Sequence, residues 1–164
     1  MKGVNIMLKK LVGVALASVL AFGAISVQAE NLQNEVTGYL SKGKVTMVTA
    51  YGEIVGDHFH KGIDLVFHDN IVYTPINGKV EKLETYDDNL SLIIISNKNV
   101  KDSIVLANVK NCPLKKGQKV KVGDVIGEAG SNSIHFEYWP FGYGKDIPVD
   151  PRPFLSLNGT DFEE

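Results

Sequence analysis

The last two thirds of the chain consist largely of short apolar runs, each followed by turn-forming residues. The runs are rich in Val, Ile, Leu and Thr, and Asp, Asn and Gly separate them, which is typical of β-strands joined by tight turns. The stretch Leu92–Ile95 is apolar without alternation, which predicts a strand covered on both faces. We therefore predict strands at Val45–Ala50, Ile63–Phe67, Gly78–Leu83, Leu90–Ser96 and Ile104–Val109.

The rest of the pattern also favours an all-β fold. No segment after Ala29 carries a helical repeat. Between Leu114 and Gly130, short Val/Ile stretches flank two turn glycines, Gly117 and Gly123, which is typical of a tightly wound corner of a barrel. The Pro-rich segment 140–154 predicts an extended wrap. The predicted class is all-β, an antiparallel sheet or barrel-sandwich.

The N-terminal 29 residues have the pattern of an export signal. Lys2, Lys9 and Lys10 precede the apolar run Leu11–Ile25, and small residues end at Ala29. The run is shorter than the roughly 20 residues that span a membrane, although an uncleaved anchor remains the alternative. The predicted organisation is a signal peptide at 1–29, a lead-in at 30–50, a domain at 51–157 and a tail at 158–164.

Charge and cysteine content narrow the possible functions. Removal of the three signal-peptide lysines from 17 basic residues changes the net charge from −2 to about −5. An acidic domain argues against nucleic-acid binding, which needs clustered positive charge. The single cysteine, Cys112, has no partner for an internal disulfide.

The candidate chemistry lies in two short motifs. His60 and Asp64 stand four residues apart, and both side-chain types bind first-row divalent ions, zinc above all. Between them, Gly62 allows the backbone to bend so that the two side chains converge. His135 offers a third ligand. Strand alternation places Ser133, His135 and Glu137 on one face, opposite Ile134, Phe136 and Tyr138.

Several motifs in order carry a family resemblance. The sequence contains HKGID, then VYTPINGKVEKL, LKKGQKVKVGDVIGEAGS, IHFE and PVDPRPFL. From Tyr51 to Leu155 the chain resembles the lysostaphin/LytM-type zinc metallopeptidases, which are peptidoglycan endopeptidases. The resemblance implies an antiparallel fold of the duplicated-hybrid-motif type and a secreted, cell-wall location. It also implies one zinc ion, with His60, Asp64 and His135 as ligands.

Two departures from the family pattern affect catalysis. The family's H-x-H motif begins with a catalytic histidine where this chain has Ser133, and a second catalytic histidine is replaced by Asn108. A general base contributes roughly 10²–10⁴-fold and an oxyanion donor about 10²–10³-fold, so peptide hydrolysis should be very slow without both. His58 or His68 could substitute for the lost histidines.

The sequence therefore predicts an exported metallopeptidase-like protein, secreted or extracytoplasmic, that has lost proteolysis. Its expected partner is a peptidoglycan peptide or another envelope protein, with no nucleic acid and no membrane contact after signal cleavage. The enzyme alternative is an active zinc-dependent peptidoglycan endopeptidase with an altered proton shuttle. Two further alternatives are a lipoyl-type carrier, which lacks its hairpin lysine, and a domain that has lost its metal. The aromatic residues of segment 138–143 could line a ligand groove or pack beneath a loop: Tyr138, Trp139, Phe141 and Tyr143.

Overall fold

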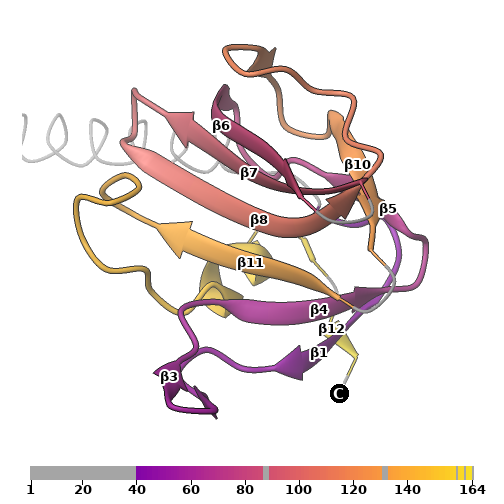
Figure 1. The fold of residues 1–164 in the computed structure, drawn as a ribbon, viewed down its shortest axis with the longest axis vertical. Coiled ribbons are helices and arrows are strands. Elements are labelled where there is room, and N and C mark those ends of the chain that lie inside the picture. Colours follow the sequence, from indigo (N-terminus) through magenta and orange to yellow (C-terminus); the bar gives the residue numbers. More distant parts are fainter. Residues whose placement is uncertain (1–39, 87–88, 131–132, 158, 161, 164) are drawn as a thin grey trace, which may run out of the picture. The chain divides into compact units, whose positions relative to one another are not determined.

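A computed structural model describes residues 40–164 except 87–88, 131–132, 158, 161 and 164 (Figure 1). For Leu157 and Glu163 it describes the backbone alone. The predicted signal peptide and residues 30–39 of the predicted lead-in lie outside these residues. Within the described part, no helix is long and apolar enough to cross a membrane.

The described residues form twelve strands and one helix, so the predicted all-β class is confirmed. All five predicted strands are present, with bounds that differ by a few residues. The elements in chain order are β1 (Val45–Thr49), β2 (Ile54–Val55), β3 (His58–Phe59), β4 (Ile63–Phe67), β5 (Ile71–Tyr73), β6 (Gly78–Tyr86), β7 (Leu90–Asn97), β8 (Asp102–Lys110), β9 (Lys119–Val120), β10 (Val125–Ala129), β11 (Ile134–Trp139), α2 (Arg152–Leu157) and β12 (Phe162–Glu163).

One sheet contains all strands except the β2–β3 hairpin. Its order is β12-β1-β4-β11-β8-β7-β6-β9, and β10 joins β5 to the end of β8. The pairings are antiparallel apart from β1 with β12. Strands β4, β11 and β8 lie side by side across the middle of the molecule (Figure 1). Strands β1 and β12, from the predicted lead-in and tail, are therefore part of the sheet.

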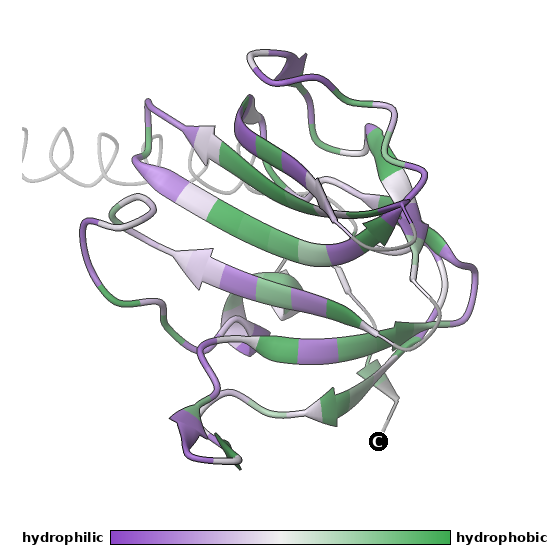
Figure 2. Ribbon diagram, viewed as in Figure 1, coloured by the Kyte–Doolittle hydropathy of each residue, from purple (hydrophilic) through white to green (hydrophobic). Residues whose placement is uncertain are grey.

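The main core lies on one face of the sheet. Alternate residues of β4 and β11 are fully buried there, and Phe154 and Leu155 of α2 pack against them. A smaller apolar cluster of Ile94, Val105 and Trp139 lies apart from the main core. Because β7 contributes Ile93 and Ile95 to the main core and Ile94 to the smaller cluster, its apolar run is covered on both faces, as predicted. Apolar residues accordingly dominate the inner strands β7 and β8 in Figure 2.

Helix α2 is absent from the sequence prediction, which gave an extended wrap for this segment. Asp150 accepts a hydrogen bond from the Arg152 backbone N–H at 3.0 Å, and Pro151 follows it. An Asp cap followed by proline is a typical helix start. The helix has only six residues, which is too short to produce a visible helical repeat.

The predicted corner between Leu114 and Gly130 is confirmed as two tight turns and the short strands β9 and β10. Gly117 and Gly123 have φ values of 88° and 83°, a left-handed conformation that glycine adopts without penalty. The Gly117 N–H donates to the carbonyl of Val80 on β6 at 2.8 Å. The first turn precedes β9, and the second connects β9 to β10.

Candidate metal centre

Two of the three predicted metal ligands face each other across neighbouring strands. Asp64 on β4 lies directly opposite His135 on β11 in the antiparallel register. Their neighbours Ile63, Leu65 and Ile134 point into the core and are fully buried, so the alternation of each strand turns Asp64 and His135 to the other face. The predicted alternation of β11 is thus present in the structure.

The third predicted ligand, His60, precedes β4 in a turn that is held by backbone hydrogen bonds. The His60 N–H donates to the carbonyl of Glu53 at 2.9 Å, and the His60 carbonyl accepts from Gly52 at 3.0 Å. The ring atom Nδ1 lies 2.9 Å from the carbonyl oxygen of Ala50. Because a carbonyl only accepts, Nδ1 carries the proton and Nε2 presents a lone pair in the neutral ring.

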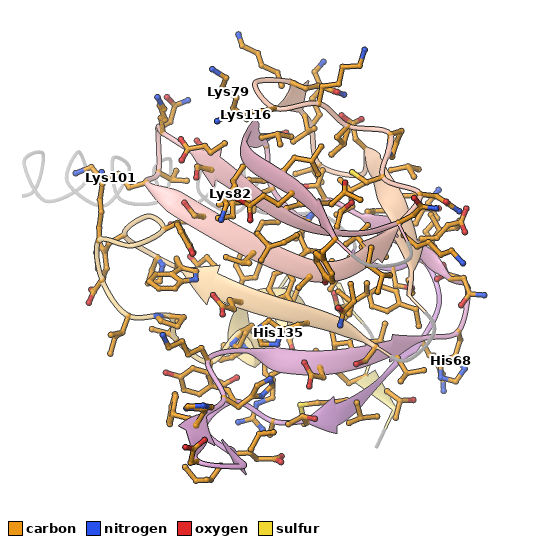
Figure 3. The ribbon with its side chains drawn as sticks, in the orientation of Figure 1. His68, Lys79, Lys82, Lys101, Lys116 and His135 are labelled. Atoms are coloured by element: carbon orange, nitrogen blue, oxygen red, sulfur yellow. The ribbon has the colours of Figure 1, made fainter. Side chains whose placement is uncertain are left out.

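The structure brings the three side chains together. His60 Nε2 lies 3.1 Å from His135 Nδ1, and Asp64 Oδ1 lies 2.9 Å from His135 Nδ1 and 3.3 Å from His60 Nε2. Their candidate ligand atoms all lie within 4.8 Å of one another. His135 is shown on β11 in Figure 3.

Gly62 is needed here for a reason that the sequence did not indicate. It is buried, and a Cβ at this position would lie 2.2 Å from the carbonyl oxygen of Phe136 and 2.9 Å from Cε1 of His135. Its φ is not in the left-handed region, so a special bend is not the requirement. The missing side chain instead lets the chain before β4 approach β11 and the His135 ring closely.

Glu137 lies beside Nε2 of His135, the ring nitrogen that does not face the other two candidate ligands, and Trp139 forms a hydrogen bond to Glu137. The Glu137 Oε1 atom lies 3.3 Å from His135 Nε2, and Oε2 accepts a 2.7 Å hydrogen bond from the Trp139 indole N–H. A carboxylate behind a ligating histidine fixes the ring's tautomer and orientation. The sequence contained this signal, because Glu137 and Trp139 continue the strand face of His135.

The charge around His135 favours its protonated form in the metal-free protein. Burial alone would lower the pKa of His135, but hydrogen bonds to Glu137 and Asp64, and the charges of these carboxylates, outweigh burial and raise it above its usual value. Two ring nitrogens and a carboxylate oxygen that meet at these distances need a donated hydrogen or a metal ion between them.

The donor set fits zinc. When both imidazoles are neutral, His60 donates to Ala50 and His135 donates to Glu137, so Nε2 of His60 and Nδ1 of His135 present lone pairs to the same point. Asp64 adds an anionic oxygen there. Two nitrogen ligands and one oxygen ligand are the set found in many catalytic zinc sites, which leave one position open.

Asn108 occupies a bulge in β8. Ile93 pairs with Leu106 and Ser91 with Val109, so Ala107 and Asn108 stand opposite the single residue between them on β7. Asn108 has a φ of 66°, the left-handed conformation that asparagine tolerates better than most residues. The predicted catalytic-histidine position is therefore on a distorted segment of the strand.

The side chain of Asn108 forms hydrogen bonds that tie three segments together. Its Oδ1 atom accepts from the Tyr86 hydroxyl at 2.7 Å, and its backbone N–H donates back to that hydroxyl at 2.9 Å. Its Nδ2 atom donates to the carbonyl oxygen of Ser133 at 3.1 Å. The two positions predicted to depart from the family pattern are thus joined directly, and we call this arrangement of Tyr86, Asn108 and Ser133 the Asn108 clamp.

The other histidines do not join the cluster. His58 is highly exposed and lies 3.0 Å from Asp57, and His68 follows β4, where its Nε2 atom lies 3.1 Å from the Thr46 hydroxyl. His68 lies at the far end of β4 from His135 (Figure 3). Of the four aromatic residues in segment 138–143, Tyr138 and Trp139 pack inside, whereas Phe141 and Tyr143 are exposed.

Comparison with known families decides the relationship. Residues 58–151, more than half of the chain, match peptidase family M23. The chain belongs to peptidase family M23. The matched region contains His60, Asp64 and His135, and also all three residues of the Asn108 clamp. No curated protein matches the chain at a significant level.

Solved structures of similar fold include M23 domains. Lysostaphin from Staphylococcus simulans superposes with a TM-score of 0.61 and 19% identity, over 75% of this chain and 55% of that one. A chain of the SpoIIIAH–SpoIIQ complex gives a TM-score of 0.57 and 23% identity, over 72% and 97%. LytU superposes with a TM-score of 0.55 and 24% identity, over 67% of this chain and 83% of that one. At these identities the likeness establishes the fold.

Proposed function

We propose that this M23 domain is exported to the cell envelope, holds one zinc ion through His60, Asp64 and His135, and binds a peptidoglycan peptide without cleaving it. The observation that carries the proposal is the Asn108 clamp. It leaves the two family positions for catalytic histidines with an amide and a serine. The three metal ligands nevertheless converge.

A zinc ion at this centre would act as a Lewis acid toward a peptide carbonyl. Cleavage also needs a group that takes a proton from water and delivers one to the leaving amine. The Asn108 amide has no basic site at neutral pH, and its oxygen and nitrogen are already hydrogen-bonded to Tyr86 and Ser133. Serine is too weak a base to replace imidazole.

The other carboxylate and histidine side chains that we considered for this role already face partners of their own. Glu137 is the nearest carboxylate behind the ligands, but its two oxygens face His135 and Trp139. His58 and His68 are exposed and face other partners, Asp57 and Thr46. These contacts count against the altered proton shuttle that an active enzyme would require.

Exposed apolar side chains near the centre favour a bound chain. Ile54 on β2 is 69% exposed, and Phe59 on β3, next to His60, is 49% exposed. Ile147, in the loop after β11, is 72% exposed. The Tyr51 hydroxyl donates to the Pro148 carbonyl at 2.8 Å, which brings the base of the β2–β3 hairpin to this loop. A bound peptide would contact the exposed apolar residues of the β2–β3 hairpin and of the loop after β11 while its carbonyl faces the metal.

A second candidate partner for these exposed apolar residues is another envelope protein. One solved structure of similar fold is a SpoIIIAH–SpoIIQ complex, so this fold occurs in a protein–protein assembly. Exposed apolar side chains also suit a protein interface. We rank the peptide first because the metal ligands have converged, which a purely protein-binding surface would not need.

The test is co-sedimentation of the purified, zinc-loaded protein with insoluble peptidoglycan, followed by chromatography of any soluble peptides. We expect the protein in the pellet and no released peptide. His135→Ala, which removes one ligand, should bind peptidoglycan more weakly. Retention of the protein in the supernatant would contradict peptide binding, and chelator-sensitive peptide release would establish the endopeptidase alternative.

A further inference from the structure

A group of lysines lines three adjoining hollows on the part of the sheet formed by β6, β7 and β8. The hollows have volumes of about 370, 380 and 300 Å³, and Glu81 lines all three. Lys98 and Lys116 each line two of them, so the hollows form one elongated tract. We call this surface the lysine tract and define it by Lys79, Lys82, Lys98, Lys101, Lys116 and Lys145.

The lysines come from four separate segments. Two lie on β6, two flank the β7–β8 turn, one lies in the loop before β9 and one in the loop after β11. Figure 3 labels four of them, and all four lie on the β6–β8 side of the molecule. The fold therefore gathers these charges from residues that are up to 66 positions apart, between Lys79 and Lys145.

Most of these charges have no internal partner. Lys82 forms an ion pair with Glu84 at 2.9 Å, and among the described residues no carboxylate pairs with the other five lysines. Lys79 also lies directly opposite Lys119 in the β6–β9 pairing. Like charges opposite one another destabilise a sheet, so this arrangement does not serve the fold. The acidic residues of the hollows are Glu81, Glu84 and Asp102.

The concentration of positive charge contrasts with the chain as a whole, whose net charge is −2. A local excess of lysine on an acidic protein attracts anions, and the effect weakens with salt. Because the hollows adjoin one another, they suit a long ligand with several charges better than a single ion.

The residue types indicate phosphate rather than an acidic protein. The positively charged residues of the tract are all lysines. Lysine ammonium groups bind phosphates as point charges, whereas lysine is depleted from protein–protein interfaces. Phe141 and Tyr143 add exposed aromatic faces that can contact the sugar or alkyl links between charges. We propose that the lysine tract binds an anionic polymer whose repeating charges are phosphates.

The tract connects to the metal centre through aromatic contacts. The Tyr143 ring lies 5.1 Å from the Trp139 ring, and Trp139 donates to Glu137, which supports His135. A polymer in the tract would thus lie beside the face that carries the metal ligands. Binding does not require zinc, so this inference stands apart from the proposed function.

The test is fluorescence titration of the purified protein with long-chain inorganic polyphosphate and, separately, poly-L-glutamate of matched length. We expect tighter binding of polyphosphate, with log affinity that falls linearly against log salt by about 0.7 per lysine engaged, as for single-stranded polyanions. Addition of a chelator should leave the affinity unchanged.

A matched pair of double variants locates the binding. Lys98→Gln with Lys116→Gln changes two lysines that each line two hollows, and we expect about a tenfold loss of polyphosphate affinity at low salt. Lys110→Gln with Lys121→Gln makes the same charge change at exposed positions outside the hollows and should have little effect. Thermal melts confirm that both variants fold.

Three results would overturn the proposal. They are absence of polyphosphate binding at low salt, equal losses in the two double variants, and equally tight binding of poly-L-glutamate. The third result would point to an acidic protein partner instead. Failure of peptidoglycan binding would affect only the proposed function, because polyphosphate binding is measured without it.

Discussion

The metal-ligand cluster and the Asn108 clamp lie on neighbouring parts of one sheet, yet they are built differently. In the cluster, β4 and β11 pair in regular register, and alternation alone turns Asp64 and His135 to the same point. In the clamp, β8 is bulged, Asn108 has a left-handed φ of 66°, and its side chain forms hydrogen bonds to Tyr86 and Ser133.

On the proposed function, this difference separates the part of the scaffold that holds the metal from the part that would carry out proton transfer. The ligand cluster depends on close strand approach, on carboxylate support behind a ring and on burial. The clamp consists of hydrogen bonds that hold segments together, at the two positions where we predicted the loss of catalytic histidines. We therefore expect variants of the first region to affect metal binding and variants of the second to affect stability.

The largest expected effect is that of Gly62→Ala. Its Cβ would lie 2.2 Å from the Phe136 carbonyl oxygen and 2.9 Å from the His135 ring, so β4 and β11 must separate. We expect a loss of about 3 kcal/mol in the free energy of unfolding, at the upper end for overpacking, together with loss of bound zinc.

Gly43→Ala is the matched control for this prediction, because its nearest new contact is 3.4 Å away. Chemical denaturation and elemental analysis measure the two properties. Wild-type zinc content in Gly62→Ala would show that close approach of these strands is unnecessary for the centre.

The next effect concerns the support behind His135. Glu137→Gln can accept from His135 only by turning an NH₂ group toward the Trp139 indole N–H, so one hydrogen bond is lost. We expect zinc affinity to fall about 10–100-fold, the usual range for residues that orient metal ligands.

Competition with a zinc-binding dye gives the affinities, and His135→Ala supplies the lower limit. Glu128→Gln makes the same charge change at an exposed carboxylate that accepts from Asn111, and it should bind zinc normally. If Glu137→Gln and Glu128→Gln bind zinc equally, Glu137 does not position the ring.

The clamp gives a smaller effect of a different kind. Asn108→Ala removes the side-chain bonds to Tyr86 and Ser133 and places alanine, which tolerates the left-handed conformation less well than asparagine, at φ 66°, so we expect about 2 kcal/mol of lost stability. Asn108→Gly loses the same bonds but relieves the backbone strain, and about 1 kcal/mol of that loss should return.

Both clamp variants should keep one zinc ion, as shown by denaturation and metal analysis on the same samples. A loss of zinc in Asn108→Gly would mean that the two regions are coupled. We expect the metal-ligand cluster and the clamp to respond independently.

The smallest effect is the pH dependence of metal binding. The pKa of His135 is raised in the folded, metal-free protein. Its protonation therefore stabilises that form below the unfolded pKa, and this stability is lost as pH rises through the folded pKa. The same proton competes with zinc at Nδ1, so apparent zinc affinity should increase as pH rises through the raised pKa and then level off.

Calorimetric titrations across this pH range measure the effect. Zinc affinity that stays constant through the titration of His135 would exclude this ring as a ligand.

Strand patterns in the sequence were sufficient to predict most of the fold. Apolar runs with turn residues between them located five strands, and the face of β11 that carries His135 followed from alternation alone. The register that places Asp64 opposite His135 comes from long-range pairing, which a local pattern does not contain.

Other features depended on contacts between distant residues. The need for Gly62 arises from the approach of Phe136, 74 positions away, and the bulge at Asn108 depends on its bonds to Tyr86 and Ser133. The lysine tract could not be predicted, because its members come from four segments. Helix α2 had a readable cap at Asp150, but six residues carry too little periodicity.

The most direct test of the central claim is peptide release from purified peptidoglycan by the zinc-loaded wild-type protein, measured by chromatography with and without a chelator. Asn108→His with Ser133→His serves as the comparison, because it returns imidazoles to both positions; Ser133→His should contribute more, since it lies two residues before His135. We predict no chelator-sensitive release by the wild type and measurable release by the double variant. Chelator-sensitive release by the wild type would show that proton transfer survives without these histidines and would contradict the account.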